Sequence, residues 1–205
     1  MKYALCATLL TAFAGCTGQI YLDGTGAPSV GSTPDNGSAG AGGAAPDNGS
    51  AGGAGGGIDP LPNDPFAVPS TCTSKISWTQ GNEGSADMNP GLACISCHAA
   101  EPDAPKFAIA GTVYPTAHEP DLCNGAGSAA AVQVVVTGAD GTTLTLIPNT
   151  VGNFSYRGAL ATPYKVKVVS MGRERAMGGA QTSGDCNSCH TKGGANGAPG
   201  RIVLP

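Results

Sequence analysis

The stretch from residue 17 to about residue 71 contains almost nothing that a hydrophobic core could use. Thirteen glycines lie between Gly24 and Gly57, and the unit Pro34–Gly40 recurs as Pro46–Gly52, a repeat with a period of 12 residues. Gly, Ala and Ser bury too little apolar surface to offset the entropy lost when the backbone becomes ordered. About 55 such residues form a coil roughly 40 Å from end to end. The sequence therefore predicts a disordered linker over residues 16–71.

Charge is spread unevenly along the chain. No Lys or Arg lies between Lys2 and Lys75, whereas nine basic and nine acidic residues balance one another from Lys75 onward. Binding to nucleic acid depends on clustered Lys and Arg side chains, which neutralise phosphates. Because no such cluster is present in the sequence, we expect no nucleic acid among the partners.

The N-terminus has the three parts of an export signal. Lys2 is followed by an apolar run over Tyr3–Ala14 and then by Gly15 and Cys16. The run is too short to span a bilayer. Residues 13–16 (FAGC) resemble the lipobox of bacterial lipoproteins, which implies a signal peptide over residues 1–15 and a lipid on Cys16. An ordinary signal peptide with a coincidental Cys is the alternative.

The resemblance to lipoproteins also bears on where the protein acts. Thr17 in place of Asp after Cys16 is similar to the pattern that sorts lipoproteins to the outer membrane. We therefore expect an exported protein anchored to a bacterial membrane through lipid on Cys16, on the periplasmic or the cell-surface side.

Six of the eight cysteines remain after the signal and the lipid site are set aside. Cysteines of exported proteins are free to form disulfides. Four of the six fall into two short motifs, which leaves Cys72 and Cys123. We expect these two to form a disulfide; reduced and intermolecular states are the alternatives.

The two motifs share the pattern C-x-x-C-H: one covers residues 94–98 (CISCH) and the other residues 186–190 (CNSCH). This pattern is typical of c-type haem attachment. Two thiols on one helical turn can bond to the two vinyl groups of a porphyrin, and the adjacent His can then bind the iron. Two copies, which use two of only three His residues in an exported chain, make the signal strong.

The paired motifs resemble those of dihaem c-type cytochromes. The resemblance implies two covalent haems, one on Cys94 and Cys97 and one on Cys186 and Cys189, with His98 and His190 as the proximal iron ligands. Two other interpretations remain open. The four cysteines could bind one structural zinc, or each pair could be a disulfide or a redox dithiol.

The sixth iron ligands are less well defined by the sequence. Only 15 residues follow His190, and they include neither Met nor His, which excludes a downstream Met ligand for the second haem. The first candidate is His118, the one imidazole outside the motifs. The other candidates are Met88 and Met177, which precede the two motifs, and Met171.

The segment between the motifs has the alternation of β-strands. Apolar residues recur with period two over residues 107–114, 132–136, 143–146, 152–156 and 164–168, with turn sequences between them. Such alternation predicts antiparallel sheets with one buried face. The order of these segments resembles carboxypeptidase-regulatory-like modules, which are related to transthyretin and imply an Ig-like sandwich scaffold.

The fold predicted from these patterns is mainly β. A sandwich over residues 107–170 is flanked by haem segments with loops or short helices over residues 72–106 and 171–205. Five strands would place the chain's entry and exit at opposite ends and so separate the haems. The 15 residues Met171–Asp185 are, however, long enough to return.

The leading functional hypothesis is an electron carrier that exchanges electrons with redox proteins of the envelope. No motif pairs a nucleophile with a base, so a carrier is favoured over a catalyst. One alternative is a surface lipoprotein whose β-sandwich binds a glycan or a protein. Another is a haem enzyme with an open sixth position, such as a peroxidase.

Overall fold

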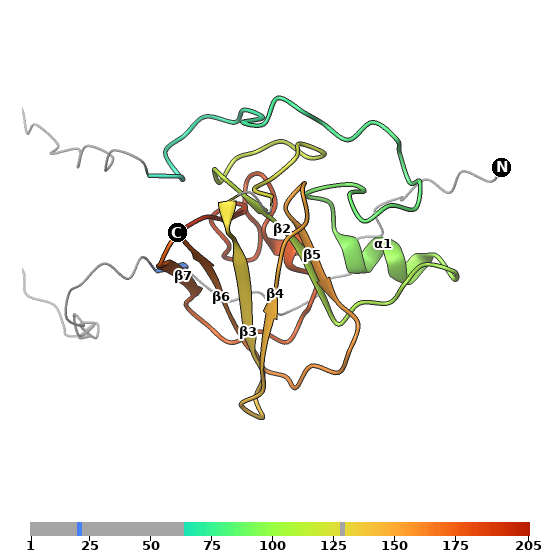
Figure 1. The fold of residues 1–205 in the computed structure, drawn as a ribbon, viewed down its shortest axis with the longest axis vertical. Coiled ribbons are helices and arrows are strands. Elements are labelled where there is room, and N and C mark those ends of the chain that lie inside the picture. Colours follow the sequence, from blue (N-terminus) through green and yellow to red (C-terminus); the bar gives the residue numbers. More distant parts are fainter. Residues whose placement is uncertain (1–19, 22–63, 128–129) are drawn as a thin grey trace, which may run out of the picture.

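The computed structural model describes residues 20–21, 64–127 and 130–205. The predicted signal peptide (1–15), Cys16 and most of the predicted linker lie outside these residues. The described part is mainly β with two short helices, as the alternation of apolar residues predicts (Figure 1). Neither described helix has the length and apolar composition that a bilayer span requires.

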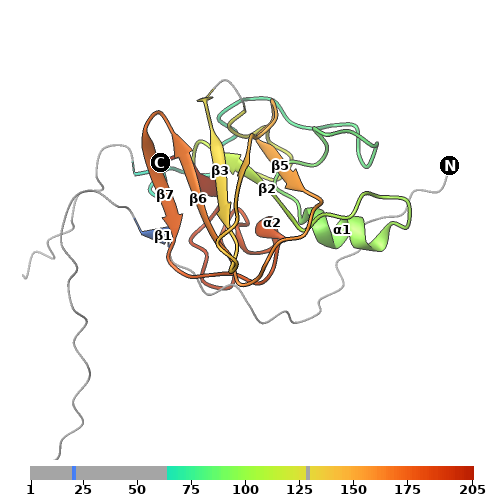
Figure 2. The ribbon, with the colours of Figure 1, turned by 60° about the horizontal axis from the view of Figure 1, so that its bottom comes forward.

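The strands form two sheets. All neighbours in the larger sheet are antiparallel, and its strands in spatial order are β1 (Ile20–Tyr21), β7 (Arg173–Met177), β6 (Lys165–Ser170), β3 (Gln133–Thr137) and β4 (Thr143–Leu146). The smaller sheet contains β5 (Asn153–Tyr156), β2 (Ile109–Tyr114) and β8 (Ile202–Val203). In it β2 is antiparallel to β5, beside which Figures 1 and 2 show it, and parallel to β8.

The hydrophobic core lies between the two sheets. Alternate residues of β3 and β6 are buried, and all but Ser170 at the end of β6 are valine: Val134, Val136, Val166 and Val168. They belong to one cluster with Ile109, Val113 and Phe154 from the smaller sheet. Burial of alternate β-branched side chains is the usual source of stability in a sheet that has one solvent-exposed face.

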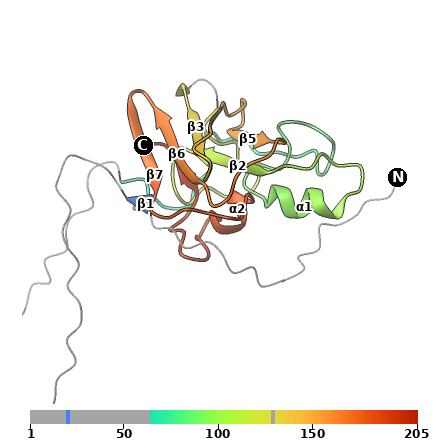
Figure 3. The same ribbon diagram turned by 90° about the horizontal axis from the view of Figure 1, so that it is seen from below.

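Strand β2 differs from the others because all six of its residues are buried. One face contributes to the core, and the opposite face is covered by the segments that carry the two helices. These helices are α1 (Cys94–Ala100) and α2 (Cys186–Cys189), which Figures 2 and 3 show next to one another beside β2. The first strand between the motifs therefore supports both motifs.

Two predicted boundaries require correction. The sheets do not end at residue 170, because β7 and β8 extend them to residue 203. The folded part also starts before residue 72: the carbonyl of Pro65 accepts a hydrogen bond from the Ala117 amide at 3.0 Å. The Phe66 ring lies under the Arg175 guanidinium, with 5.6 Å between them. Residues 20–21, also assigned to the linker, form the edge strand β1.

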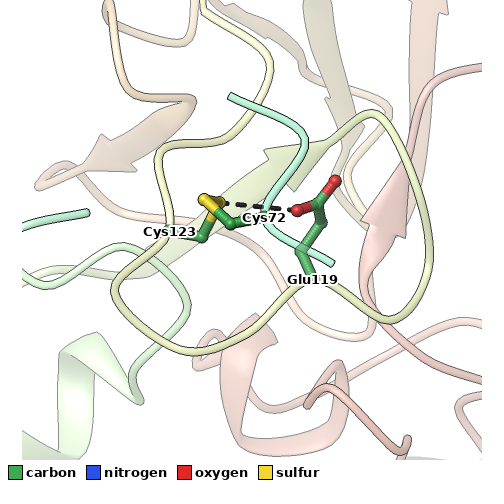
Figure 4. A group of neighbouring side chains, drawn as sticks. All are labelled: Cys72, Glu119 and Cys123. Carbon is green, nitrogen blue, oxygen red and sulfur yellow. Dashed lines mark hydrogen bonds between the residues drawn. A yellow bond between two sulfur atoms is a disulfide. The ribbon is translucent and has the colours of Figure 1, made fainter. Parts of the chain in front are cut away.

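The predicted disulfide between Cys72 and Cys123 is confirmed, with 2.08 Å between the sulfurs. It ties the segment before α1 to the loop after β2, and the buried Glu119 carboxylate lies beside it (Figure 4). Glu119 accepts hydrogen bonds from the Thr73 amide at 2.9 Å and from the Thr116 hydroxyl at 3.0 Å. The Cys123 sulfur is 3.4 Å from Oε2, a contact without a hydrogen bond because a disulfide sulfur has no proton to donate.

Candidate functional site

The two C-x-x-C-H motifs lie side by side, although 93 positions separate Cys94 of the first from Asn187 of the second. The Asn187 amide nitrogen is 3.8 Å from the Cys94 sulfur. Both motifs also contact β2, as Figure 3 shows for the helices that carry them. The expectation that a five-strand sandwich would separate the sites is therefore wrong, because the chain returns along β7 to the same side of β2.

The N-terminus of helix α1 is capped by a residue that directly precedes the second motif. Ala93, at the N-cap position, offers no side-chain hydrogen bond. Asp185 supplies one instead: its Oδ2 accepts from the Ser96 amide at 2.9 Å and from the Ser96 hydroxyl at 2.8 Å. A carboxylate at this place also interacts favourably with the helix dipole. The residue directly before the second motif thus holds the helix of the first.

Asn187, the first variable residue of the second motif, makes a second connection. Its amide donates to the Leu92 carbonyl at 2.9 Å and to the Thr112 hydroxyl at 3.1 Å, and its Oδ1 accepts from the Thr112 amide at 3.1 Å. The Thr112 hydroxyl in turn donates to Oδ1 of Asn153 at 2.8 Å. Asn187 and Thr112 are both buried. A buried network of this kind fixes the relative positions of the groups that it joins.

The Asp185 cap leads to a measurable prediction. In a D185A variant the Ser96 amide at the start of α1 loses its acceptor, and we expect the free energy of unfolding to fall by about 1–2 kcal/mol. Urea unfolding monitored by circular dichroism measures this change. The matched control is D103A, which removes an exposed carboxylate on the loop after α1 and should change stability by less than about 0.5 kcal/mol. Equal stabilities of D185A and D103A would contradict the capping role.

Each motif histidine is oriented by a backbone carbonyl. Nδ1 of His98 lies 2.9 Å from the Pro105 oxygen, and Nδ1 of His190 lies 2.9 Å from the Gly200 oxygen. A carbonyl can only accept, so Nδ1 carries the proton and Nε2 of the neutral ring keeps its lone pair. Neither Nε2 has a hydrogen bond within the described residues. Metal-binding histidines are typically held in this way.

The surroundings of the two histidines differ. His98 is half-buried, and its ring packs against Phe107 with 4.8 Å between the centroids. His190 is 3% exposed. Burial lowers the pKa of His190 below its ordinary value, which favours the neutral imidazole that can bind a metal.

A mostly apolar hollow lies beside the second motif, lined among others by Tyr164, Val166, Met177, Cys186, Cys189 and His190. A second hollow shares Val166, Met177 and His190 with it. The two are called here the first and second parts of the His190 hollow: both adjoin the histidine, and the first also adjoins both cysteines of the motif. Apolar side chains beside a histidine with an available nitrogen are a suitable lining for a hydrophobic group that contains a metal.

Three observations agree with covalent attachment of haem at the motifs. The cysteines lie on helical turns, the histidines present Nε2, and the second motif has an apolar space beside it. Burial and the nearby Asp185 carboxylate raise the pKa of the Cys94 thiol to about 12. Burial also raises the pKa of Cys186 well above its ordinary value.

The four motif sulfurs do not form a zinc cluster. Among the described residues, the one group of three or more candidate ligand atoms within 4.8 Å of one another is Cys72, Glu119 and Cys123, where both sulfurs belong to the disulfide. Cys189 is disulfide-bonded in this structure. A thioether at Cys189 would take the place of that bond.

The candidate sixth ligands occupy different places. Met177 lines the His190 hollow, whereas Met171 is 80% exposed in the turn between β6 and β7. Met88 lies in the loop before the first motif, where its carbonyl accepts a hydrogen bond from the Asn153 side-chain amide at 3.0 Å. The structure thus brings Met177, and not Met171, together with His190.

His118 has carbonyl oxygens next to both ring nitrogens. Nδ1 lies 2.7 Å from the Lys192 oxygen and Nε2 lies 3.2 Å from the Phe66 oxygen. The ring thereby joins the segment before the disulfide to the loop after the second motif. Iron binding through Nε2 would require the loss of the Phe66 contact.

Sequence reasoning missed the residues that join the two motifs: Ser96, Thr112, Asp185, Asn187 and Arg201. The Ser96–Asp185 contact spans 89 positions, and Ser96 and Asn187 occupy the variable positions that the motif pattern leaves unspecified. Comparisons with protein-family models, with curated proteins and with solved structures found no match to this chain.

Proposed function

We propose that the chain is a lipid-anchored dihaem c-type cytochrome that transfers electrons at the bacterial envelope. Cys94 and Cys97 would hold one haem, with His98 as the proximal iron ligand. Cys186 and Cys189 would hold the other, with His190 in the same role. Haem iron supplies one-electron chemistry, cycling between the ferric and ferrous states.

The observation that carries this proposal is the matched arrangement of the two motif histidines. Each donates Nδ1–H to a backbone carbonyl at 2.9 Å and leaves Nε2 available, at the end of a helical turn that carries two cysteines. A chance C-x-x-C-H would have no reason to orient its imidazole in this way. That both sites do so supports a shared metal-binding role.

The closeness of the motifs supports electron transfer over catalysis. Asp185 and Asn187 join the attachment points through hydrogen bonds of 2.8–3.1 Å. Two redox centres attached to adjacent turns suit rapid exchange of an electron between them. The buried network keeps their relative position fixed, so little structural rearrangement would accompany each transfer.

Met177 is the candidate sixth ligand that we favour for the second iron, because it lines the His190 hollow with the proximal histidine. A thioether ligand raises the potential relative to a second imidazole. Met88, in the loop before the first motif, remains a candidate for the first iron, and His118 remains a candidate for either iron.

The fold and the anchor complete the proposal. The Ig-like, transthyretin-like β-sandwich would act as a scaffold that presents the haem sites to redox proteins. Lipid on Cys16, with the linker to residue 71, would keep the protein on the outer membrane and give it reach.

A spectroscopic redox titration tests the electron-transfer function. In protein produced with a haem-attachment system, we expect a low-spin spectrum with six-coordinate iron and reversible one-electron reduction at both haems. A high-spin spectrum would favour an open site and therefore the peroxidase-like enzyme. A protein with no visible absorption would favour the β-sandwich binding module.

A further inference from the structure

Arg175 on β7 is a buried cation whose hydrogen-bonding capacity is only partly used. The residue is 6% exposed. Its Nε donates to the Leu204 carbonyl at 3.1 Å, and its guanidinium lies 5.6 Å from the centre of the Phe66 ring. Its Nη1 is buried and has no hydrogen-bond partner within the described part of the chain. A buried charged donor without an acceptor is costly.

No carboxylate of the described residues forms an ion pair with Arg175. The two ion pairs found there join Lys167 to Glu174 and Arg201 to Asp121. Asp64 attracts the guanidinium at longer range, and burial lowers the pKa of Arg175 from its ordinary value. An arginine stays charged nonetheless, so an anion that accepts a hydrogen bond from Nη1 would stabilise the site.

The position of Arg175 relates it to the second motif. Alternate residues of a strand face the same way, and on β7 the exposure pattern places Arg175 and Met177 on the covered face and Ala176 on the exposed one. Arg175, Met177 and His190 all line the second part of the His190 hollow. An apolar hollow with a metal-binding imidazole and a buried guanidinium matches a hydrophobic ring that also bears a carboxylate.

We infer that Arg175 binds a propionate carboxylate of the porphyrin held by Cys186 and Cys189. The inference rests on the proposed function and adds a binding subsite to it. A guanidinium can donate two parallel hydrogen bonds to a carboxylate, and the Nη1 group left unpaired by the protein is one such donor. The contact orients the ring in the hollow and neutralises one of its negative charges.

The test is the midpoint potential of the second haem in an R175Q variant. Loss of the guanidinium leaves the propionate charge uncompensated, which stabilises ferric iron relative to ferrous iron, so the potential should fall. We expect about a tenfold change in the oxidation equilibrium, which is about 59 mV for one electron. Titration in a C94S/C97S background, where only the second haem remains, assigns the potential.

Two further variants separate charge neutralisation from general effects. R173Q removes an exposed arginine on the same strand and should leave the potential nearly unchanged. R175K keeps the charge but not the planar pair of donors, so its potential should lie between those of the wild type and R175Q. An R175Q potential equal to that of the wild type would overturn the inference.

A measurement without any variant keeps the inference testable if R175Q does not fold. In the reduced, diamagnetic protein, nuclear Overhauser effects are expected between the Arg175 side chain and a propionate methylene of the haem on Cys186 and Cys189. Their absence, with both haems attached, would overturn the Arg175 subsite and leave the cytochrome proposal intact. Absence of haem from the wild type would instead contradict the cytochrome proposal itself.

Discussion

Replacement of Cys94 and Cys97 by serine is expected to remove one of the two covalent haems and to leave the other on Cys186 and Cys189. Each motif supplies both of its own thioether sulfurs, so loss of one pair does not remove the other attachment point. The reciprocal C186S/C189S variant should likewise retain one haem, on the first motif. The haem-to-protein ratio, measured from the visible spectrum and the protein concentration, should fall from about two to about one in each variant.

The conservative variant I95V serves as the control. It lies inside the first motif but alters neither a cysteine nor the histidine, so it should keep both haems. If the cysteines are structural and the protein is a binding module, all of these proteins should lack visible absorption. Loss of both haems in both cysteine variants would show that the two sites cannot be loaded independently.

Removal of the Arg201 side chain is expected to cause the largest loss of stability. Arg201 is fully buried. Its Nε donates to the Glu119 carbonyl at 3.0 Å, and its Nη1 donates to the Gly91 carbonyl at 2.9 Å and contacts the His190 carbonyl at 3.4 Å. Its Nη2 also pairs with the Asp121 carboxylate. One guanidinium thus joins the segment before the first motif, the loop after β2 and the end of the second motif.

An R201A variant leaves these carbonyls without a donor and opens a cavity beside the Tyr114 ring, which lies 5.1 Å from the guanidinium. We expect the free energy of unfolding to fall by about 3–5 kcal/mol. Urea unfolding of the variant and the wild type, each with the same haem content, measures the change.

The control is R173A, because Arg173 is an exposed arginine. Its loss should change stability by less than about 0.5 kcal/mol. R201K should recover only part of the loss, since an ammonium cannot reproduce the fork of donors. An R201A protein within about 1 kcal/mol of the wild type would refute the role of Arg201.

The strands that the sequence predicts are those with simple alternation. Val134 and Val136 in β3 and Val166 and Val168 in β6 show period two directly. Strand β7 was missed because its buried position is Arg175, which a hydrophobic pattern counts as polar. Strand β8 contains two residues, too few to show any period.

The residues of the candidate site could be recognised in the sequence, but their arrangement could not be predicted. C-x-x-C-H is a local pattern, so Cys94 and Cys186 are recognisable without a fold. The hydrogen bond from Ser96 to Asp185 joins residues 89 positions apart, and nothing in a single sequence specifies such a pair. The carbonyls that orient His98 and His190 belong to the backbone, which carries no sequence signal.

The start of the folded part was misplaced for a related reason. Residues 64–71 contain two prolines and follow Pro60 and Pro62, so their composition resembles the linker's. Phe66 nevertheless packs under Arg175, and Pro65 accepts a hydrogen bond from Ala117. These two contacts, with the contact between the His118 ring and the Phe66 carbonyl, attach a segment whose composition predicts disorder.

The central claim is that each C-x-x-C-H motif carries a covalent haem. A pyridine haemochrome spectrum together with the intact mass of the protein, produced with a haem-attachment system, tests it most directly. The account predicts two haems per chain, each bonded through two thioethers. A mass without haem, with the motif cysteines as thiols, disulfides or zinc ligands, would contradict it.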